Sequence, residues 1–166
     1  ARSWFEKDVS LRAELAVNGG RRALIAYWRD KEWKELGALL AEITRDERIM
    51  GAAACGADLR TLARTPEYPD RFRCGDIAEH VRPTASTPAR EWTTWRSVMD
   101  LPGGPVSLSA FPIADQETPL GFVVLVHDLS FMQRRQQSMR LFLLAAFGVL
   151  AACASVITVM AARLSW

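Results

Sequence analysis

The feature that most constrains this chain is an uncharged segment in its last quarter. From Leu141 to Ala162 the sequence has no Asp, Glu, Lys, Arg or His, and Arg140 and Arg163 flank it directly. A helix of that length spans about 33 Å, and the hydrocarbon core of a bilayer is about 30 Å thick. The segment is therefore predicted to be a transmembrane helix. The alternative is a buried core helix, but such helices are usually shorter and apolar on one side only.

The part of the chain before this segment is long enough for one domain with a hydrophobic core. Its charges argue against a nucleic-acid partner, because the whole chain carries 21 basic and 19 acidic residues without a block of one sign. The chain begins with Ala rather than Met and ends at Trp166. We therefore expect it to be a piece of a longer protein, with residues 163–166 as the start of a truncated cytoplasmic part.

The arginines beside the apolar segment bear on its orientation. Arg134, Arg135 and Arg140 precede the segment, and only Arg163 follows it. Taken alone, the positive-inside rule would place the N-terminal domain in the cytoplasm.

The cysteines argue for the opposite orientation. Cys55 and Cys74 each lie near a turn and bracket a short loop, a pattern typical of a disulfide in an extracytoplasmic domain. Two unrelated buried thiols are the alternative. Neither cysteine has metal-ligand spacing, and His80 and His127 do not cluster with them, so no metal site is predicted.

Helical periodicity marks the N-terminal part of the chain. Residues 1–28 are predicted to form an amphipathic helix, and residues 31–44 a second helix. Asn18-Gly19-Gly20 is expected to kink or break the first helix, because two glycines cost about 2 kcal/mol relative to alanine. The apolar positions are Trp4, Phe5, Leu11, Leu15, Leu24, Ile25 and Trp28 in the first helix and Trp33, Leu36, Leu39, Leu40 and Ile43 in the second.

The period then changes to that of strands. The predicted strands cover residues 49–55, 59–64, 91–101, 106–113 and 120–127. The last of these is the richest in valine and is expected to be central in the sheet.

A proline-rich crossover over residues 65–88, with a short helix around residues 76–81, interrupts the strands. After the last strand, Ser130 and Gln133 fit a capping box at the start of a helix that runs into the membrane segment.

This order predicts an α+β protein. We expect a PAS-like or single-Cache-like domain over residues 1–129. It would have a five-stranded antiparallel sheet, long N-terminal helices and helices on one face of the sheet. Residues 130–140 would be a juxtamembrane helix, and residues 141–162 the transmembrane helix.

Several short motifs of the soluble part carry a family resemblance. They are Thr44-Arg-Asp-Glu-Arg-Ile49, Cys55-Gly-Ala-Asp58, Arg64-Thr-Pro66, Cys74 and Gly121-Phe-Val-Val-Leu-Val-His127-Asp128-Leu-Ser130-Phe131, followed by Arg134-Arg135. They resemble the N-terminal region of HAMP-containing, membrane-anchored bacterial trehalose-6-phosphate synthases.

In that family a membrane-flanked extracytoplasmic sensor region precedes a HAMP-like linker and a cytoplasmic glycosyltransferase domain. The resemblance implies a sensory and anchoring region in the bacterial inner membrane, facing the periplasm. The UDP-glucose-dependent glycosyltransferase would lie outside this chain.

No enzyme chemistry is predicted for the chain itself. It has neither a phosphate-binding glycine-rich loop nor a nucleophile motif, so we expect no catalytic residues and no cofactor. His127-Asp128 is an adjacent imidazole–carboxylate pair, but it lies where the last strand meets the final helix. We interpret Asp128 or Ser130 as a cap of that helix, and a pH-sensing role for His127 stays open.

Ligand recognition is expected in the irregular crossover, because loops on a rigid sheet usually carry it. Trp92 and Trp95 are an odd number of positions apart, so in a regular strand they would face opposite sides and only one could line a given pocket. Solvated arginines and core tryptophans are the alternative. The candidate ligand-binding residues, suited to an anion, are Arg64, Tyr68, Arg71, Arg73, Arg82 and Trp95.

These patterns favour a sensory or regulatory module with the bilayer, an unidentified small molecule and a second copy of the chain as partners. The second copy would pack through the membrane and juxtamembrane helices, where Gly148 lies among Ala145, Ala146, Ala151 and Ala152. A ligand-free dimerisation and anchoring scaffold is the alternative. So is the sensor domain of a histidine kinase, a cyclase or a chemoreceptor.

Overall fold

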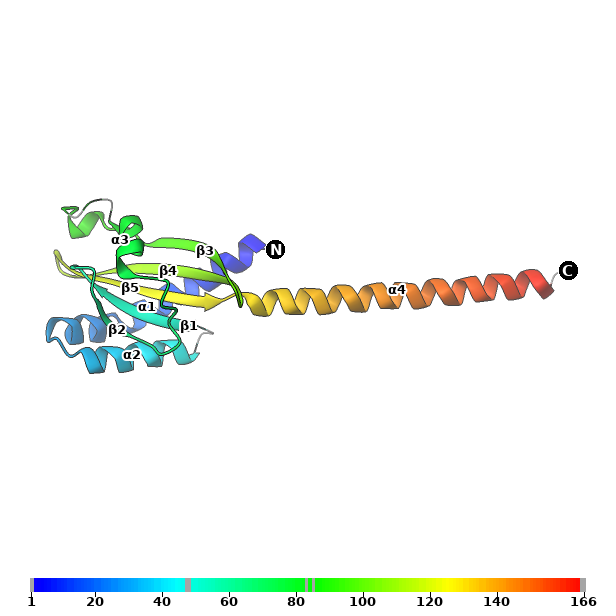
Figure 1. Cartoon of the computed structure of the whole chain (residues 1–166), viewed down its shortest axis with the longest axis horizontal. Helices are drawn as coiled ribbons and strands as arrows, with labels where there is room; N and C mark the ends of the chain where they lie inside the picture. The colour runs from blue at the N-terminus through cyan, green and yellow to red at the C-terminus, as the bar shows by residue number, and fades with distance from the viewer. Residues whose placement is uncertain (1, 47–48, 83, 85, 165–166) are drawn as a thin grey trace. The chain divides into compact units, whose positions relative to one another are not determined.

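The computed structural model describes residues 2–46, 49–82, 84 and 86–164 (Figure 1). The chain divides into two compact units, Ala1–Asp128 and Leu129–Trp166. The first unit combines helices with a sheet, and the second is a single long helix.

The sheet of the first unit has five antiparallel strands in the order β2-β1-β5-β4-β3. Its strands are β1 (Ile49–Gly56), β2 (Thr61–Arg64), β3 (Trp95–Leu101), β4 (Gly104–Asp115) and β5 (Thr118–Asp128). The five-stranded antiparallel sheet of the prediction is confirmed, and β5 is its central strand as expected.

Tight turns connect the last three strands. Pro102 and Gly103 join β3 to β4, and Leu101 pairs with Gly104 across that turn. Gln116 and Glu117 join β4 to β5. Pro102 and Gly103 favour a turn. In the second turn Gln116 instead adopts a positive φ of 56°.

Helices cover both faces of this sheet, so the expectation that they pack on one face is wrong. Helices α1 (Arg2–Arg29) and α2 (Trp33–Asp46) lie against one face, and α3 (Cys74–Val81) lies with the crossover against the other (Figure 1). The reason is strand alternation: successive side chains of β1, β4 and β5 point to opposite faces, and both sets are apolar.

Each face therefore has its own core layer. The layer under α1 and α2 includes Ala52, Ala54, Phe111, Ile113, Val123 and Leu125 from the sheet. The layer under α3 includes Ala53, Cys55, Val106, Leu108, Ala110, Phe122, Val124 and Val126.

The predicted break at Asn18-Gly19-Gly20 is wrong, because α1 continues through it. Val17 and Leu24, on either side of the glycines, are both buried in the layer that α1 shares with α2 and the sheet. This burial outweighs the weak helix propensity of the glycines. A Cβ at Gly20 would lie 3.6 Å from Ile43 Cδ1 of α2, an ordinary contact distance.

The predicted strand over residues 91–101 starts too early. A short 3-10 helix, η1 (Ala89–Glu91), is followed by irregular chain, and β3 begins only at Trp95. Trp92 is therefore outside the strand, where its indole N–H donates to the Thr87 carbonyl oxygen at 2.9 Å. Trp92 and Trp95 pack against the same core layer, so the expectation that they face opposite sides is wrong.

The second unit is the helix α4 (Ser130–Leu164). Within the described residues, its window Leu144–Ala161 has the length and apolar composition needed to cross a membrane, and none of that window is buried. A core helix would be covered, so this exposure argues against that alternative.

Some sequence-based interpretations fall on side chains outside the described set. These side chains are Trp4 and Phe5 of α1 and Gln133, Arg134, Arg135 and Arg140 of α4.

Candidate ligand-binding groove

A groove of about 410 Å³ lies at one end of the sheet, where several strands begin or end. Four segments that are far apart in the sequence meet there: the start of β1, the crossover, the β3–β4 hairpin and the end of β5. The lining residues are Met50, Glu67, Pro69, Asp70, Arg71, Leu101, Pro102, Gly103, Gly104, Val106 and Asp128.

The antiparallel register brings these segments together. Ile49 at the start of β1 pairs with His127 near the end of β5. Val106 at the start of β4 pairs with Asp128. These strand ends thus lie together at one end of the sheet, and the crossover closes the groove beside them.

The groove combines an apolar lining with charged groups. The apolar part comes from Met50, Leu101 and Val106, together with prolines of the crossover and the hairpin. Its size and composition fit a small-molecule site, because such sites are concave, mostly apolar and carry a few polar groups.

The charged side chains of the crossover differ in the interactions that they make. Asp70 forms an ion pair with Arg64. The Arg71 guanidinium lies 5.7 Å from the centre of the Phe72 ring. Among the described residues, the Glu67 carboxylate has no hydrogen-bond or ion-pair partner.

Tight contacts fix the crossover against β1. The Ala52 N–H donates to Thr65 Oγ1 at 3.0 Å, and the Tyr68 hydroxyl donates to the Phe72 carbonyl oxygen at 2.9 Å. A Cβ at Gly51 would lie 2.7 Å from the Tyr68 Cα, so only glycine allows this approach. Tyr68 is buried, and burial raises the pKa of its phenol.

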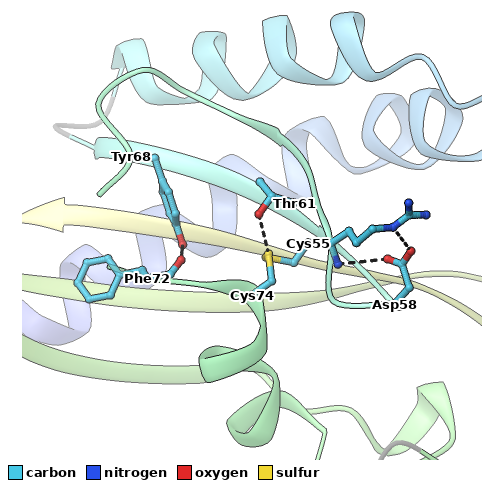
Figure 2. The surroundings of a disulfide bond; sticks show 7 residues. Cys55, Asp58, Thr61, Tyr68, Phe72 and Cys74 are labelled. Atoms are coloured by element: carbon cyan, nitrogen blue, oxygen red, sulfur yellow. Dashed lines mark hydrogen bonds and ion pairs between the residues drawn. A yellow bond between two sulfur atoms is a disulfide. The ribbon is translucent and has the colours of Figure 1, made fainter. Parts of the chain in front are cut away.

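A disulfide between Cys55 and Cys74 confirms the predicted pairing (Figure 2). It joins β1 to the first residue of α3, with a Cα–Cα distance of 5.6 Å. Both cysteines are buried, and Thr61 Oγ1 lies 3.3 Å from Cys74 Sγ. The disulfide therefore closes a covalent loop that contains β2 and residues 65–73 of the crossover.

The predicted arginine cluster does not converge on one site. Arg73 pairs with Asp76 at 3.3 Å, and Arg82 lies 5.5 Å from the Trp92 ring centre. Trp95 stacks on His80 with ring centroids 4.4 Å apart. Of the six predicted ligand-binding residues, only Arg71 lines the groove, since Arg64 pairs with Asp70 and Tyr68 holds the crossover.

His127 and Asp128 do not form an acid–base pair. Successive strand residues point to opposite faces, so His127 points toward the α1–α2 face while Asp128 lines the groove. His127 is 3% exposed, and neither ring nitrogen has a hydrogen-bond partner among the described residues. Burial lowers the pKa of His127 from 6.5 to about 4, so the imidazole is neutral at pH 7.

The capping interpretation of Asp128 and Ser130 stays a prediction. Helix α4 begins at Ser130, and both residues take part in interactions within the structure. The Gln133 side chain needed for the capping box is among those that lie outside the described set.

Sequence reasoning missed most of the groove. Glu67, Asp70 and the Leu101–Gly104 hairpin lie in segments correctly predicted as loops or strand ends, but only the strand order brings them together. Among the residues that the structure describes, no group of three His, Cys, Asp or Glu side chains could hold a metal ion.

Comparisons with known proteins add no relationship. No protein-family model matches the chain, and no curated protein matches it. The molecule is thus defined by its own features. It is a disulfide-bonded domain of helices and an antiparallel sheet, followed by a helix long and apolar enough to cross a membrane.

Proposed function

We propose that this chain is an extracytoplasmic sensory and membrane-anchoring module of a bacterial inner-membrane protein. The first unit would face the periplasm as a PAS-like or Cache-like sensor, and α4 would cross the membrane. A cytoplasmic output domain beyond this chain would respond, and by resemblance that domain is a trehalose-6-phosphate synthase.

The observation that carries the extracytoplasmic assignment is the buried disulfide between Cys55 and Cys74. Structural disulfides persist in oxidising compartments and are rare in the cytosol. We give this observation more weight than the arginines beside the membrane segment, because the positive-inside rule depends on charges on both sides of the helix.

The groove supports sensing over a purely structural role. Asp128 lines the groove, and α4 begins only two residues later, at Ser130. A ligand that changes the position of the end of β5 would therefore act on the residues that lead directly into α4. Small helix shifts of this kind are an established way to transmit signals.

In a homodimer, such a shift would change how the two α4 helices pack against each other. Apart from its chain neighbours and the nearby backbone of its own helix, no described atom lies within 4 Å of the place where a Cβ of Gly148 would be. Small residues of this kind allow two membrane helices to approach closely. We propose that the second copy packs through α4.

Cysteine accessibility in intact spheroplasts tests the orientation. Cys153 is the free cysteine, so the experiment starts from Cys153→Ala. Ser86→Cys and Glu117→Cys each place a thiol at an exposed position of the first unit, and Arg163→Cys places one beyond the apolar window.

We expect a membrane-impermeant maleimide to label Ser86→Cys and Glu117→Cys in intact spheroplasts and Arg163→Cys only after lysis. The reverse pattern would show that the first unit is cytoplasmic, and the proposal would then be wrong.

A further inference from the structure

We propose that the edge strand β3 pairs with β3 of a second copy of this chain, so that the two sheets join into one antiparallel sheet. The pairing is centred on Val98 and places Arg96 of each copy opposite Asp100 of the other. This interface goes beyond the proposed sensory function and does not depend on a ligand.

The first argument is the free backbone edge of β3. Among the described strands, β3 is last in the sheet and pairs only with β4 (Figure 1). The two-residue turn makes Leu101 and Gly104 a hydrogen-bonded pair, and such pairs alternate along an antiparallel ladder with pairs that are not hydrogen-bonded. The N–H and C=O groups of Arg96, Val98 and Asp100 therefore point away from β4. Such an edge is a template for another strand.

The structure supplies no other backbone partner for these groups. Within the part of the chain that the structure describes, none of the backbone hydrogen bonds outside the helices and strand ladders involves residues 95–101. The free edge is thus available to a strand from outside the chain.

The second argument is the charge pattern along this edge. Arg96 and Asp100 lie two residues to either side of Val98, and all three side chains are exposed on one face of the strand. In an antiparallel pair related by a two-fold axis at Val98, Arg96 of each copy lies opposite Asp100 of the other. Opposite charges in this position are favourable, whereas a register centred on Arg96 or on Asp100 would place like charges opposite each other. The charges therefore select the register centred on Val98.

Both charged groups are able to make this contact. Among the described residues, the Asp100 carboxylate has no hydrogen-bond or ion-pair partner. Arg96 Nη2 donates to Glu14 Oε2 of α1 at 3.1 Å. A guanidinium has five N–H donors, so Arg96 can bind Glu14 and the carboxylate of the second copy together.

The third argument is the apolar surface on both faces of β3. Val98 is 43% exposed, and in the joined sheet the Val98 side chains of the two copies lie opposite and cover each other. On the other face, Trp95 lies opposite Leu101 of the second copy. Both residues are partly buried against the core layer under α3, so the pairing extends that layer across the interface.

This contact is separate from the proposed packing through α4. The antiparallel pairing places the ends of the two β5 strands at opposite ends of the joined sheet. The β3 contact is therefore made with a different neighbour from the one that packs through α4. The two contacts together would link copies into a row.

Cross-linking of the full chain in detergent micelles tests the pairing. In the Cys153→Ala background, Val98→Cys places two thiols at the two-fold axis. A bismethanethiosulfonate with a spacer of about 5 Å, the separation of opposite Cβ atoms, can join them. Glu117→Cys in the exposed β4–β5 turn measures random collision. We expect at least about fivefold more cross-linked dimer from Val98→Cys than from Glu117→Cys.

Exchange of the charges tests the register. Added to Val98→Cys, Asp100→Arg gives a chain with arginine at both positions, and Arg96→Asp gives one with aspartate at both. Each variant alone should form roughly fivefold less dimer, because like charges then lie opposite. A mixture of the two should recover the dimer, because each arginine then lies opposite an aspartate. A mass tag on one variant identifies the mixed dimer, and recovery shows that both variants are folded.

Equal cross-linking of Val98→Cys and Glu117→Cys overturns the proposal. Undiminished cross-linking of either charge variant overturns it as well, as does a mixture that forms no more dimer than the separate variants. These outcomes leave the proposed function standing, because the maleimide labelling tests that function separately.

Discussion

At the residue scale, Gly121 on β5 occupies a position that no other residue can fill. Its φ is 151°, in the region that favours glycine. A Cβ at this position would lie 2.0 Å from the Cys55 carbonyl oxygen and 2.7 Å from Trp28 Cζ2. The close packing of β5 against β1 and α1 therefore requires that position 121 has no side chain.

Gly121→Ala is expected to destabilise the domain by roughly 3 kcal/mol or more, because backbone strain and a steric clash add. Urea unfolding of the full chain, followed by tryptophan fluorescence, measures the change. Gly103→Ala is the control, since a Cβ there has nothing within 4 Å, and it should change the free energy of unfolding by less than about 0.5 kcal/mol. Equal effects of the two variants would contradict the prediction.

His127 predicts how stability depends on pH. Its pKa is about 4 in the folded protein, against 6.5 when unfolded, so the unfolded chain binds the proton more readily. The neutral, buried imidazole contributes its full stabilisation above pH 6.5. This stabilisation is lost as the pH falls from 6.5 toward 4, and below pH 4 the free energy of unfolding loses nothing further from His127. The loss should reach about 3 kcal/mol at most.

The measurement is the free energy of unfolding between pH 7.5 and pH 4. His127→Val should remove most of the loss in this interval, because the buried site then has no group to protonate. His80→Gln is the comparison, since His80 is exposed and stacks on Trp95. It should keep the wild-type slope.

At the element scale, local patterns predicted most strands and the second helix. The valine content of residues 120–127 identified the central strand, and helical periodicity over residues 31–44 identified α2. These signals lie within a few neighbouring residues, which is why sequence alone was sufficient.

The errors arose where packing between distant segments decides the structure. Burial of Val17 and Leu24 keeps α1 intact across Gly19 and Gly20. The second face of the sheet is covered because both alternating sets of strand residues are apolar, a property visible only once the strand order is known.

The candidate site was harder to predict for the same reason. The arginines of the crossover were identified as a group, but most of them contact a residue only a few positions away, such as Arg73 with Asp76. The groove instead depends on segments that only the register of β1, β4 and β5 brings together.

Gly19→Ala should stabilise the protein, because α1 is a continuous helix in which a Cβ at Gly19 would meet no atom within 4 Å. Alanine is favoured over glycine inside a helix by about 1 kcal/mol. Urea unfolding of the full chain measures the gain. A loss of stability would instead support the kink expected from the sequence.

At the scale of the whole molecule, a compact domain is followed by a single helix that contains the candidate membrane span. Leu150 lies near the middle of this window and is 65% exposed. An exposed leucine side chain is unfavourable in contact with water and favourable in contact with lipid.

Leu150→Arg should lower membrane insertion of α4 by about 3 kcal/mol, because a charge near the middle of a membrane helix is costly. The inserted fraction in a translocon-based glycosylation assay measures this effect. Leu150→Val should insert like the wild type. Equal insertion of both variants would contradict a membrane-spanning role for this window.

The disulfide has a further consequence for the integrity of the backbone. Cys55 and Cys74 are separated by 19 positions, and the bond between them makes that stretch a closed ring. A protease that cuts once inside the ring, for example at the exposed Arg71, would leave the two pieces covalently joined. The nicked protein would migrate as one species without reductant and as two with it. The wall of the groove is therefore a place where the chain can be cut and the domain still remain attached to its membrane helix.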